Sequence, residues 1–218
     1  MKKAFTMMEL IFVLIVIGIL AAVIMPEMKS NKLREAAIQV ISHIRYTQHL
    51  AMVDDKFDIN DDWYKGRWQM IFSKSNHGGK DTNNGFSYSI YSDSGAYDGN
   101  PNLGELAKYP MSSDKYLSGG DSGILDTDDP RANKKMNIGE SYDVSAVDFT
   151  AGCAHATVKR ITFDHLGRPI QGTINGFNKS YVNNKLIQSR CEIVLTSSEG
   201  SITIAIEPET GYAHILES

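Results

Sequence analysis

The pattern of apolar and polar positions divides the chain into an N-terminal apolar run, an amphipathic segment and a long region of alternating segments. From residue 5 to residue 25 almost every side chain is apolar, and Glu9 is the one acid. About 20 helical residues at ~1.5 Å each cross the core of a bilayer, so this run predicts a transmembrane helix. Pro26 follows it and predicts a bend, because proline cannot donate a helical hydrogen bond.

Beyond Pro26 the apolar residues recur at three- and four-residue steps as far as Val53. They form one stripe, and the charged residues fall mostly on the other faces, which is typical of an amphipathic helix. We therefore expect a second helical segment that packs its stripe onto a folded domain. The stripe consists of Leu33, Ala37, Val40, Ile41, Ile44 and Ala51.

From Gly66 onward the period of the apolar residues changes to two, which predicts strands. Segments 67–72 and 86–90 predict a hairpin with a long polar connection. Trp63 and Trp68 are interpreted as core or rim aromatics. Strand composition recurs at 142–149, 157–163, 191–196, 201–207 and 212–216.

Residues 92–140 are dense in Asp, Gly, Ser, Asn and Lys, with scattered apolar residues. Several carboxylates gathered in one loop are typical of calcium ligands. Their spacing does not fit an EF-hand loop, so a solvated acidic loop is the favoured interpretation and calcium the alternative. We assign no metal ion and no cofactor. The acids concerned are Asp121, Asp126, Asp128 and Asp129.

Length and composition agree with one globular domain behind one membrane segment. The chain has 218 residues, of which 42% are hydrophobic and 22% charged, and its formal net charge is −4. Such a charge does not favour general attraction to nucleic acid or anionic lipid. Lys2 and Lys3 precede the apolar run and place the N-terminus in the cytoplasm, so the rest of the chain is expected in a periplasm.

The chain has two cysteines, Cys153 and Cys191, and both fall in the part expected outside the cytoplasm. Because that compartment is oxidising, a disulfide between them is the favoured interpretation. Two separate buried thiols are the alternative.

Catalysis receives little support from the sequence. Gly120-Asp121-Ser122-Gly123 resembles the nucleophile segment of trypsin-like proteases, and Cys153-Ala154-His155 resembles their histidine segment. The order of the two segments is reversed, however, and the chain has no metal-binding helix or phosphate-binding glycine loop. We predict no catalytic residue and no enzymatic activity.

The N-terminus resembles that of type IV pilin and pseudopilin precursors. The resemblance rests on Lys2-Lys3-Ala4, then Phe5-Thr6-Met7-Met8-Glu9, then the apolar run. It implies that a prepilin peptidase cleaves between Ala4 and Phe5 and methylates the new amine of Phe5. It also implies that Glu9 pairs with that amine during assembly and that the apolar helix enters a filament core. The family usually has Gly where this chain has Ala4.

Two other interpretations of the apolar run remain. A secretory signal peptide would end near a pair of small residues such as Ala21 and Ala22. The run is long for such a signal, and Glu9 interrupts its start. An ordinary N-terminal anchor is the second alternative, and it leaves Glu9 unexplained.

The C-terminal third resembles the periplasmic domain of H-type minor pseudopilins of type II secretion systems and of FimT-like minor pilins. The matching residues are 161–169, which read ITFDHLGRP, and the strand 202–206 with the turn and Tyr212 after it. The implied fold class is α+β, with a long N-terminal helix, bent near Pro26, on a small antiparallel β-sandwich. The expected divisions are a leader at 1–4, a transmembrane and assembly helix at 5–25, an amphipathic helix at 26–54 and a periplasmic β domain at 55–218, with an insertion at about 92–140.

The implied function is that of a minor pseudopilin, a structural subunit that assembles into or primes a secretion pseudopilus or a similar filament. The implied location is the inner membrane, in a single pass, and then the filament. The expected partners are other pilins, the prepilin peptidase and the inner-membrane assembly platform.

The alternative function is that of a FimT-like minor pilin of a DNA-uptake pilus. Those relatives bind DNA through basic residues near the C-terminus, whereas residues 191–218 contain several Glu and no Lys or Arg. Because phosphate binding requires cations, we do not expect this chain to bind nucleic acid. The remaining candidates for a basic cluster are Arg160, Arg168, Lys179, Lys185 and Arg190.

Overall fold

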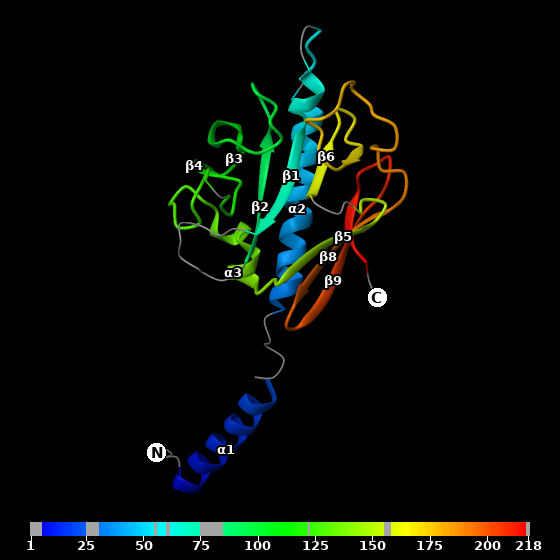
Figure 1. Cartoon of the computed structure of the whole chain (residues 1–218). Coiled ribbons are helices and arrows are strands. Elements are labelled where there is room, and N and C mark those ends of the chain that lie inside the picture. The colour runs from blue at the N-terminus through cyan, green and yellow to red at the C-terminus, as the bar shows by residue number, and fades with distance from the viewer. Residues whose placement is uncertain are drawn as a thin grey trace. The chain divides into compact units, whose positions relative to one another are not determined.

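The protein forms two compact units, Met1–Asn31 and Lys32–Ser218 (Figure 1). The computed structural model describes residues 6–24, 31–54, 56–59, 62–74, 85–121, 123–154 and 158–216. Unit 1 contains helix α1 (Met7–Ile24), and unit 2 contains the other helices and the strands.

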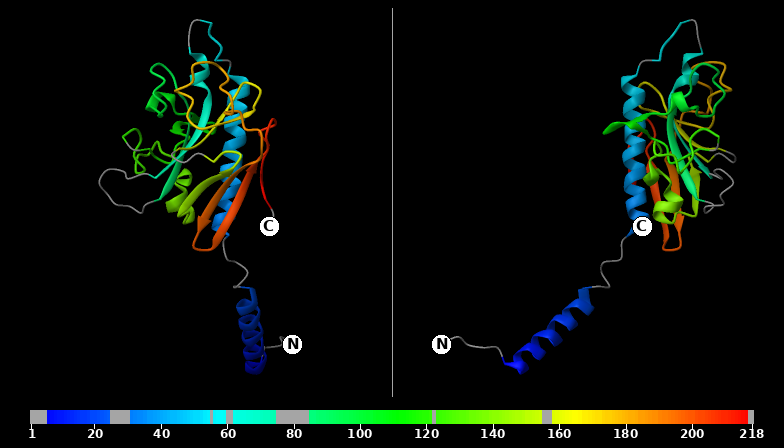
Figure 2. Two further views of the ribbon diagram at one scale, coloured as in Figure 1. Left: turned by 45° about the vertical axis from the view of Figure 1, so that its right-hand side comes forward. Right: turned by 90° about the vertical axis from the view of Figure 1, so that its left-hand side faces the viewer.

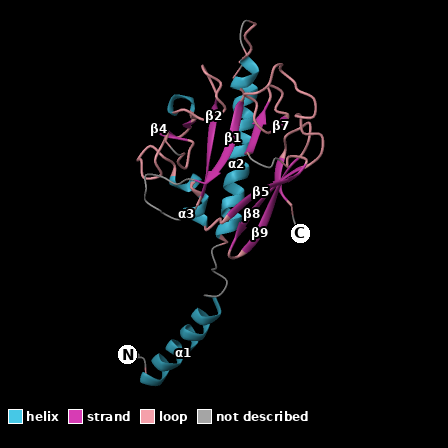
Figure 3. Ribbon diagram, in the orientation of Figure 1, coloured by secondary structure: helices cyan, strands magenta, loops and turns pink. Residues whose placement is uncertain are grey.

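The predicted fold class, with its long N-terminal helix, is wrong. The two helical patterns form separate helices, α1 of 18 residues and α2 (Lys32–Val53) of 22 residues, which belong to different units. A side-chain pattern does not show whether backbone hydrogen bonding continues from one segment to the next. Pro26, where we expected a bend, lies outside the described residues. The described part of the chain is mostly sheet and loop, and its third α-helix, α3 (Ile138–Tyr142), is short (Figure 3).

The predicted transmembrane helix, and with it the single-pass location in the inner membrane, is also wrong. Among the described residues, no helix has the length and apolar character needed to cross a membrane. The prediction took the apolar run from residue 5 to residue 25, whereas α1 begins at Met7 and ends at Ile24. Its 18 residues extend only about 27 Å, less than the ~30 Å core of a bilayer.

The first sheet of unit 2 has four antiparallel strands in the order β2-β1-β6-β7. β1 and β2 form the predicted hairpin, with Phe72 opposite Tyr88. Its connection, 75–84, lies outside the described residues. The strands are β1 (Trp68–Lys74), β2 (Phe86–Ser92), β6 (Lys159–Phe163) and β7 (Pro169–Gln171).

The second sheet also has four antiparallel strands, in the order β10-β9-β8-β5. Its strands correspond to predicted segments, except that the segment at 142–149 begins in α3 rather than in a strand. Side chains of β8 alternate between buried and partly buried, as the period of two requires. The strands are β5 (Ala146–Ala151), β8 (Cys191–Ser197), β9 (Gly200–Ile206) and β10 (Ala213–Ile215).

Helix α2 packs against both sheets and so joins them into one core. It contacts β1 and β6 of the first sheet and β8, β9 and β10 of the second. The right-hand view of Figure 2 shows α2 along one side of the strands. All six residues of the predicted stripe are buried, and α2 ends at Val53 as predicted. Ala36 and Ala37 are fully buried, and their small side chains bring the helix close to the strands.

The described residues of the segment 92–140 are held against β2 rather than forming a plain solvated loop. They contain the short strands β3 (Lys108–Tyr109) and β4 (Ser112–Tyr116), and backbone bridges join them to β2. Every residue of β2 is therefore buried, on both faces of the sheet. The insertion has an apolar cluster of its own, formed by Leu106, Leu125 and Ala132 with Tyr91 of β2.

Candidate functional site

The predicted assembly residue, Glu9, is exposed in the first turn of α1. Its backbone N–H donates to the carbonyl oxygen of Thr6 at 3.1 Å and to the Thr6 hydroxyl at 3.3 Å, so Thr6 caps the helix. A carboxylate in this turn interacts favourably with the helix dipole. Ala4 and Phe5, the predicted processing residues, lie outside the described residues.

The surface of α1 is apolar on all sides. Its large apolar side chains are exposed by fractions that range from 37% at Val16 to 79% at Met8. Residues 6–24 contain no Lys, Arg or His, so Glu9 has no cationic side chain within the described helix. A helix that is apolar all round is stable in water only when other apolar groups cover it. The exposed residues are Met7, Met8, Leu10, Ile11, Phe12, Val13, Leu14, Ile15, Val16, Ile17, Ile19 and Leu20.

The predicted disulfide between Cys153 and Cys191 is present. Cys191 begins β8, and Cys153 lies in the turn after β5, the strand that pairs with β8. Both side chains are buried, and the Cα atoms are 4.9 Å apart. The bond therefore closes the end of the β5–β8 pair.

The basic residues considered for DNA binding do not form a free basic surface. Arg160 is 3% exposed and donates to Gln69 Oε1 at 3.0 Å. The other two arginines are paired with acids, Arg168 with Asp164 at 2.8 Å and Arg190 with Glu207 at 2.9 Å. Of the five candidates, Lys179 and Lys185 are neither buried nor paired with an acid among the described residues.

The acids of the insertion do not gather into a metal site in the described part of the chain. Within it, no group of three or more His, Cys, Asp or Glu side chains is arranged to hold a metal ion. Asp129 instead binds the guanidinium of Arg131, with Nη2 at 2.8 Å and Nε at 3.0 Å. These hydrogen bonds lower the pKa of Asp129 to about 2. Ser122 and His155, of the two protease-like segments, lie outside the described residues.

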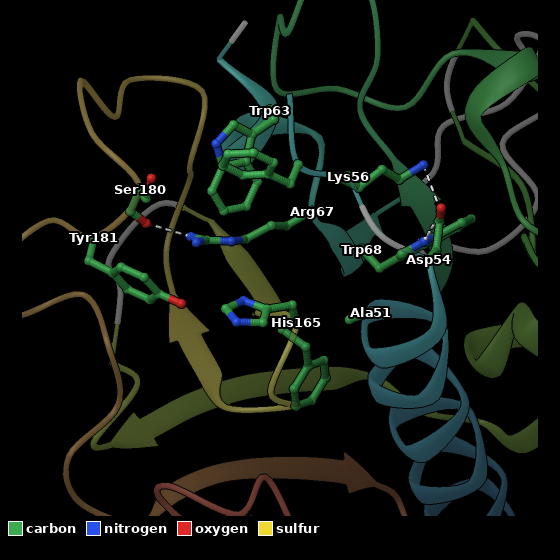
Figure 4. Close-up of a pocket in the computed structure, with 11 residues that line it drawn as sticks. Ala51, Asp54, Lys56, Trp63, Arg67, Trp68, His165, Ser180 and Tyr181 are labelled. Atoms are coloured by element: carbon green, nitrogen blue, oxygen red, sulfur yellow. Dashed lines mark hydrogen bonds and ion pairs between the residues drawn. The ribbon is translucent and has the colours of Figure 1, made fainter. Parts of the chain in front are cut away.

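A cavity that the sequence analysis did not predict lies at the C-terminal end of α2 (Figure 4). Its volume is about 450 Å³, within the range of sites that hold small molecules. One wall comes from the chain between α2 and β1, and the other from the β6–β7 turn and the loop before β8. The lining is largely apolar and includes the aromatic rings of Phe57, Trp63, Trp68, Phe163 and Tyr181.

Arg67 extends across this cavity, between Trp63 on one side and His165 and Tyr181 on the other (Figure 4). Its guanidinium carbon lies 4.8 Å from the centre of the Tyr181 ring and 5.3 Å from that of Trp63. The side chain is only 3% exposed, and this burial lowers the pKa of Arg67 from its usual value. Nη1 donates to the carbonyl oxygen of Ser180 at 2.7 Å, whereas Nε and Nη2 have no hydrogen-bond partner.

Only one signal in the sequence points toward this cavity. Phe57, Trp63 and Trp68 lie close to Arg67 along the chain, which is an unusual density of aromatic residues near one cation. Phe163 and Tyr181 come from far along the chain, and no local pattern places them opposite Arg67.

No family model, curated protein or solved structure matches this chain.

Proposed function

We propose that this protein is a minor pseudopilin, a structural subunit that assembles with other pilin-like subunits through α1. The observation that supports the proposal most is the surface of α1, which is apolar on every side and carries one carboxylate in its first turn. Burial of apolar area stabilises association by about 25 cal/mol per Å². Apolar helices of neighbouring subunits, packed around α1, bury its apolar surface in this way.

Glu9 has a defined task in this proposal. Once helices pack around α1, the carboxylate loses water, and an unpaired buried charge is costly. The closest cation along the chain is the amine that cleavage between Ala4 and Phe5 releases, on the same subunit or a neighbour. Pairing the carboxylate with this amine fixes the axial register between helices, which apolar contacts alone leave variable.

We favour this function over DNA uptake because the candidate cations of unit 2 are largely engaged. Arg160 is buried, and Arg168 and Arg190 are paired with acids, so of the five candidates two lysines are left to displace counterions from a duplex.

The decisive experiment measures cross-linking between subunits through α1. A photo-reactive amino acid at Ile17, which is 56% exposed, is introduced into the full chain in a host that makes its partner subunits. With Glu9 in place, we expect cross-links to other pilin-like subunits. Glu9→Val should reduce them more than tenfold, because removing one member of a buried ion pair costs about 3–5 kcal/mol.

Glu35→Val is the matched control. Glu35 is also an exposed acid in the first turn of a helix, α2, but no assembly role is proposed for it. Its variant should cross-link like the unmodified chain. Equal cross-linking by Glu9→Val and by the unmodified chain would overturn the proposal. Mass spectrometry of the assembled subunit adds a second test, since the proposal requires loss of residues 1–4 and a methylated Phe5.

A further inference from the structure

The guanidinium of Arg67 is buried in the cavity at the end of α2 without a carboxylate partner among the described residues. Two acids of the cavity region, Asp164 and Asp54, are already engaged. Asp164 accepts from Arg168 Nε at 2.8 Å and from the Tyr181 hydroxyl at 3.0 Å. Asp54 pairs with Lys56 at 2.7 Å and accepts from Trp68 Nε1 at 2.8 Å.

The two unpartnered nitrogens of Arg67, Nε and Nη2, lie on the same edge of the planar guanidinium. Two parallel N–H groups on one edge match the two oxygens of a carboxylate, which is the strongest arrangement that arginine makes with an anion. The third nitrogen, Nη1, is held by the carbonyl oxygen of Ser180 at 2.7 Å. That bond orients the guanidinium and leaves this edge for an anion.

The walls of the cavity define the rest of the ligand. Phe57, Trp63, Trp68 and Phe163 present apolar ring surface, and the cavity volume of about 450 Å³ exceeds what a carboxylate alone would fill. Lys56, the other cation of the lining, is paired with Asp54. One guanidinium edge among aromatic rings favours a singly charged, partly apolar anion over a polyphosphate.

We propose that this cavity binds a carboxylate that carries an aromatic or aliphatic group. The carboxylate pairs with Nε and Nη2 of Arg67, and the apolar group lies among the aromatic rings. Two sources have this chemistry: a free organic acid, and the C-terminal residue of a peptide. The proposal does not depend on the proposed assembly function, because every residue that it uses belongs to unit 2.

Access to Arg67 requires a side-chain movement. Nε and Nη2 are buried beneath neighbouring atoms, and the Trp63 and Tyr181 rings lie over the guanidinium. Tyr181 is 38% exposed and comes from the loop before β8. The movement that the proposal requires is rotation of this ring, which breaks its hydrogen bond to Asp164, while Asp164 keeps its bond to Arg168.

Tryptophan fluorescence reports on this site directly, since the chain has two tryptophans and both line the cavity. The purified full chain, in a constant concentration of nonionic detergent, is titrated with 3-phenylpropionate and with the peptide Gly-Gly-Phe. Each titration is repeated with the corresponding neutral amide, and calorimetry checks the affinities. We expect the carboxylate of at least one pair to bind about tenfold or more tightly than its amide, because the neutral amide cannot form charge-assisted hydrogen bonds with Arg67.

Variants assign this preference to Arg67. Arg67→Met should abolish the preference for carboxylate over amide, and Arg67→Lys, which keeps the charge but not the planar fork, should weaken carboxylate binding about tenfold. Arg190→Met is the control, because Arg190 is exposed and paired with Glu207 outside the cavity. It should bind like the unmodified chain, and circular dichroism shows which variants are folded.

The outcomes separate clearly. Preference for Gly-Gly-Phe over 3-phenylpropionate identifies a peptide terminus as the source, and the reverse identifies a free acid. If the unmodified chain binds carboxylates no better than amides in both pairs, the proposal is wrong. That comparison needs no variant, so it holds even if Arg67 substitutions do not fold. Equal carboxylate binding by folded Arg67→Met and the unmodified chain would also overturn it.

Discussion

The Nδ1 atom of His43 lies 2.7 Å from the hydroxyl oxygen of Tyr88, a fully buried residue of β2. The same hydroxyl accepts a hydrogen bond from Nε2 of Gln39 at 2.9 Å. Because its one proton is then available for His43, the Tyr88 hydroxyl donates to Nδ1, and the ring of His43 is neutral with its proton on Nε2. This network joins α2 to the first sheet through polar groups inside the core.

Protonation of His43 should destabilise the protein. Burial lowers the pKa of His43 to about 4, from 6.5 in the unfolded chain. Between these pH values the unfolded chain binds more protons than the folded chain. The free energy of unfolding should therefore fall as the pH is lowered from about 6.5 toward about 4, by about 1–2 kcal/mol for this partly buried ring. Urea unfolding of the unmodified chain and His43→Gln at pH 7.5 and pH 5 measures the difference.

The control for this experiment is His49→Gln, because His49 is exposed on the same helix. It should keep the pH dependence of the unmodified chain. Burial also raises the pKa of Asp93 to about 6, and its titration acts in the opposite direction. Asp93 is present in all three proteins, so the difference between them isolates His43. An unchanged pH dependence in His43→Gln would contradict the prediction.

The disulfide should contribute substantially to the stability of unit 2. It joins residues separated by 38 positions, and the loop-entropy model gives about 3–4 kcal/mol for a loop of this size. Urea unfolding of the oxidised chain is compared with unfolding in dithiothreitol. The reductant should lower the free energy of unfolding by that amount, and it should leave a variant with both Cys153→Ala and Cys191→Ala unaffected. Two free thiols by mass spectrometry after periplasmic expression would contradict the prediction.

DNA binding by the full chain should stay at the level of weak non-specific contact. We expect a Kd for duplex DNA no tighter than ~10⁻⁶ M at physiological salt, because residues 191–218 carry no Lys or Arg and three of the five candidate cations are buried or paired with acids. Fluorescence anisotropy with labelled duplex measures this affinity, and repeating it at several salt concentrations measures the number of phosphate contacts. A tighter, salt-sensitive complex would favour the DNA-uptake function instead.

Features fixed by local chemistry could be predicted from the sequence. The stripe of α2 follows from the helical period, and all its residues are buried. Asp164-His165-Leu166-Gly167 and Pro208-Glu209-Thr210-Gly211 are sequences typical of turns that end in a left-handed glycine, and Gly167 and Gly211 have φ of 79° and 63°. With two cysteines the chain allows one internal disulfide, which is the one predicted and present.

Features that depend on distant contacts could not be predicted. The apolar residues of the insertion, such as Leu106 and Leu125, have no regular period because each comes from a different turn. Their burial depends on backbone bridges to β2, which no local pattern shows. The cavity around Arg67 was missed for the same reason, since its two walls come from distant segments. The change from the apolar run to the amphipathic stripe at Pro26 predicted only a bend, and not the division into α1 and α2.

The packing of the insertion against β2 should depend on the close approach of Gly119 to the short 3₁₀-helix Lys134–Met136. The N–H of Gly119 donates to the carbonyl oxygen of Tyr88 at 3.0 Å, so this residue holds the insertion to β2. A Cβ atom at Gly119 would lie 2.3 Å from the backbone carbon of Met136, and the backbone cannot rotate away as a side chain can. Gly119→Ala should therefore separate these segments and destabilise the fold by about 1–3 kcal/mol, as overpacking of a dense interior does.

Gly104→Ala is the matched control, because Gly104 lies in the same insertion and a Cβ there has no atom within 4 Å. Urea unfolding measures the stability of both variants, and limited trypsin digestion follows cleavage at Lys134 and Lys135, which are exposed near the contact. We expect faster cleavage and lower stability for Gly119→Ala alone. If the insertion were a solvated loop that only rests on the sheet, both variants would behave like the unmodified chain. A difference confined to Gly119 instead requires that backbone packing against β2 and Met136 holds the acidic insertion in place.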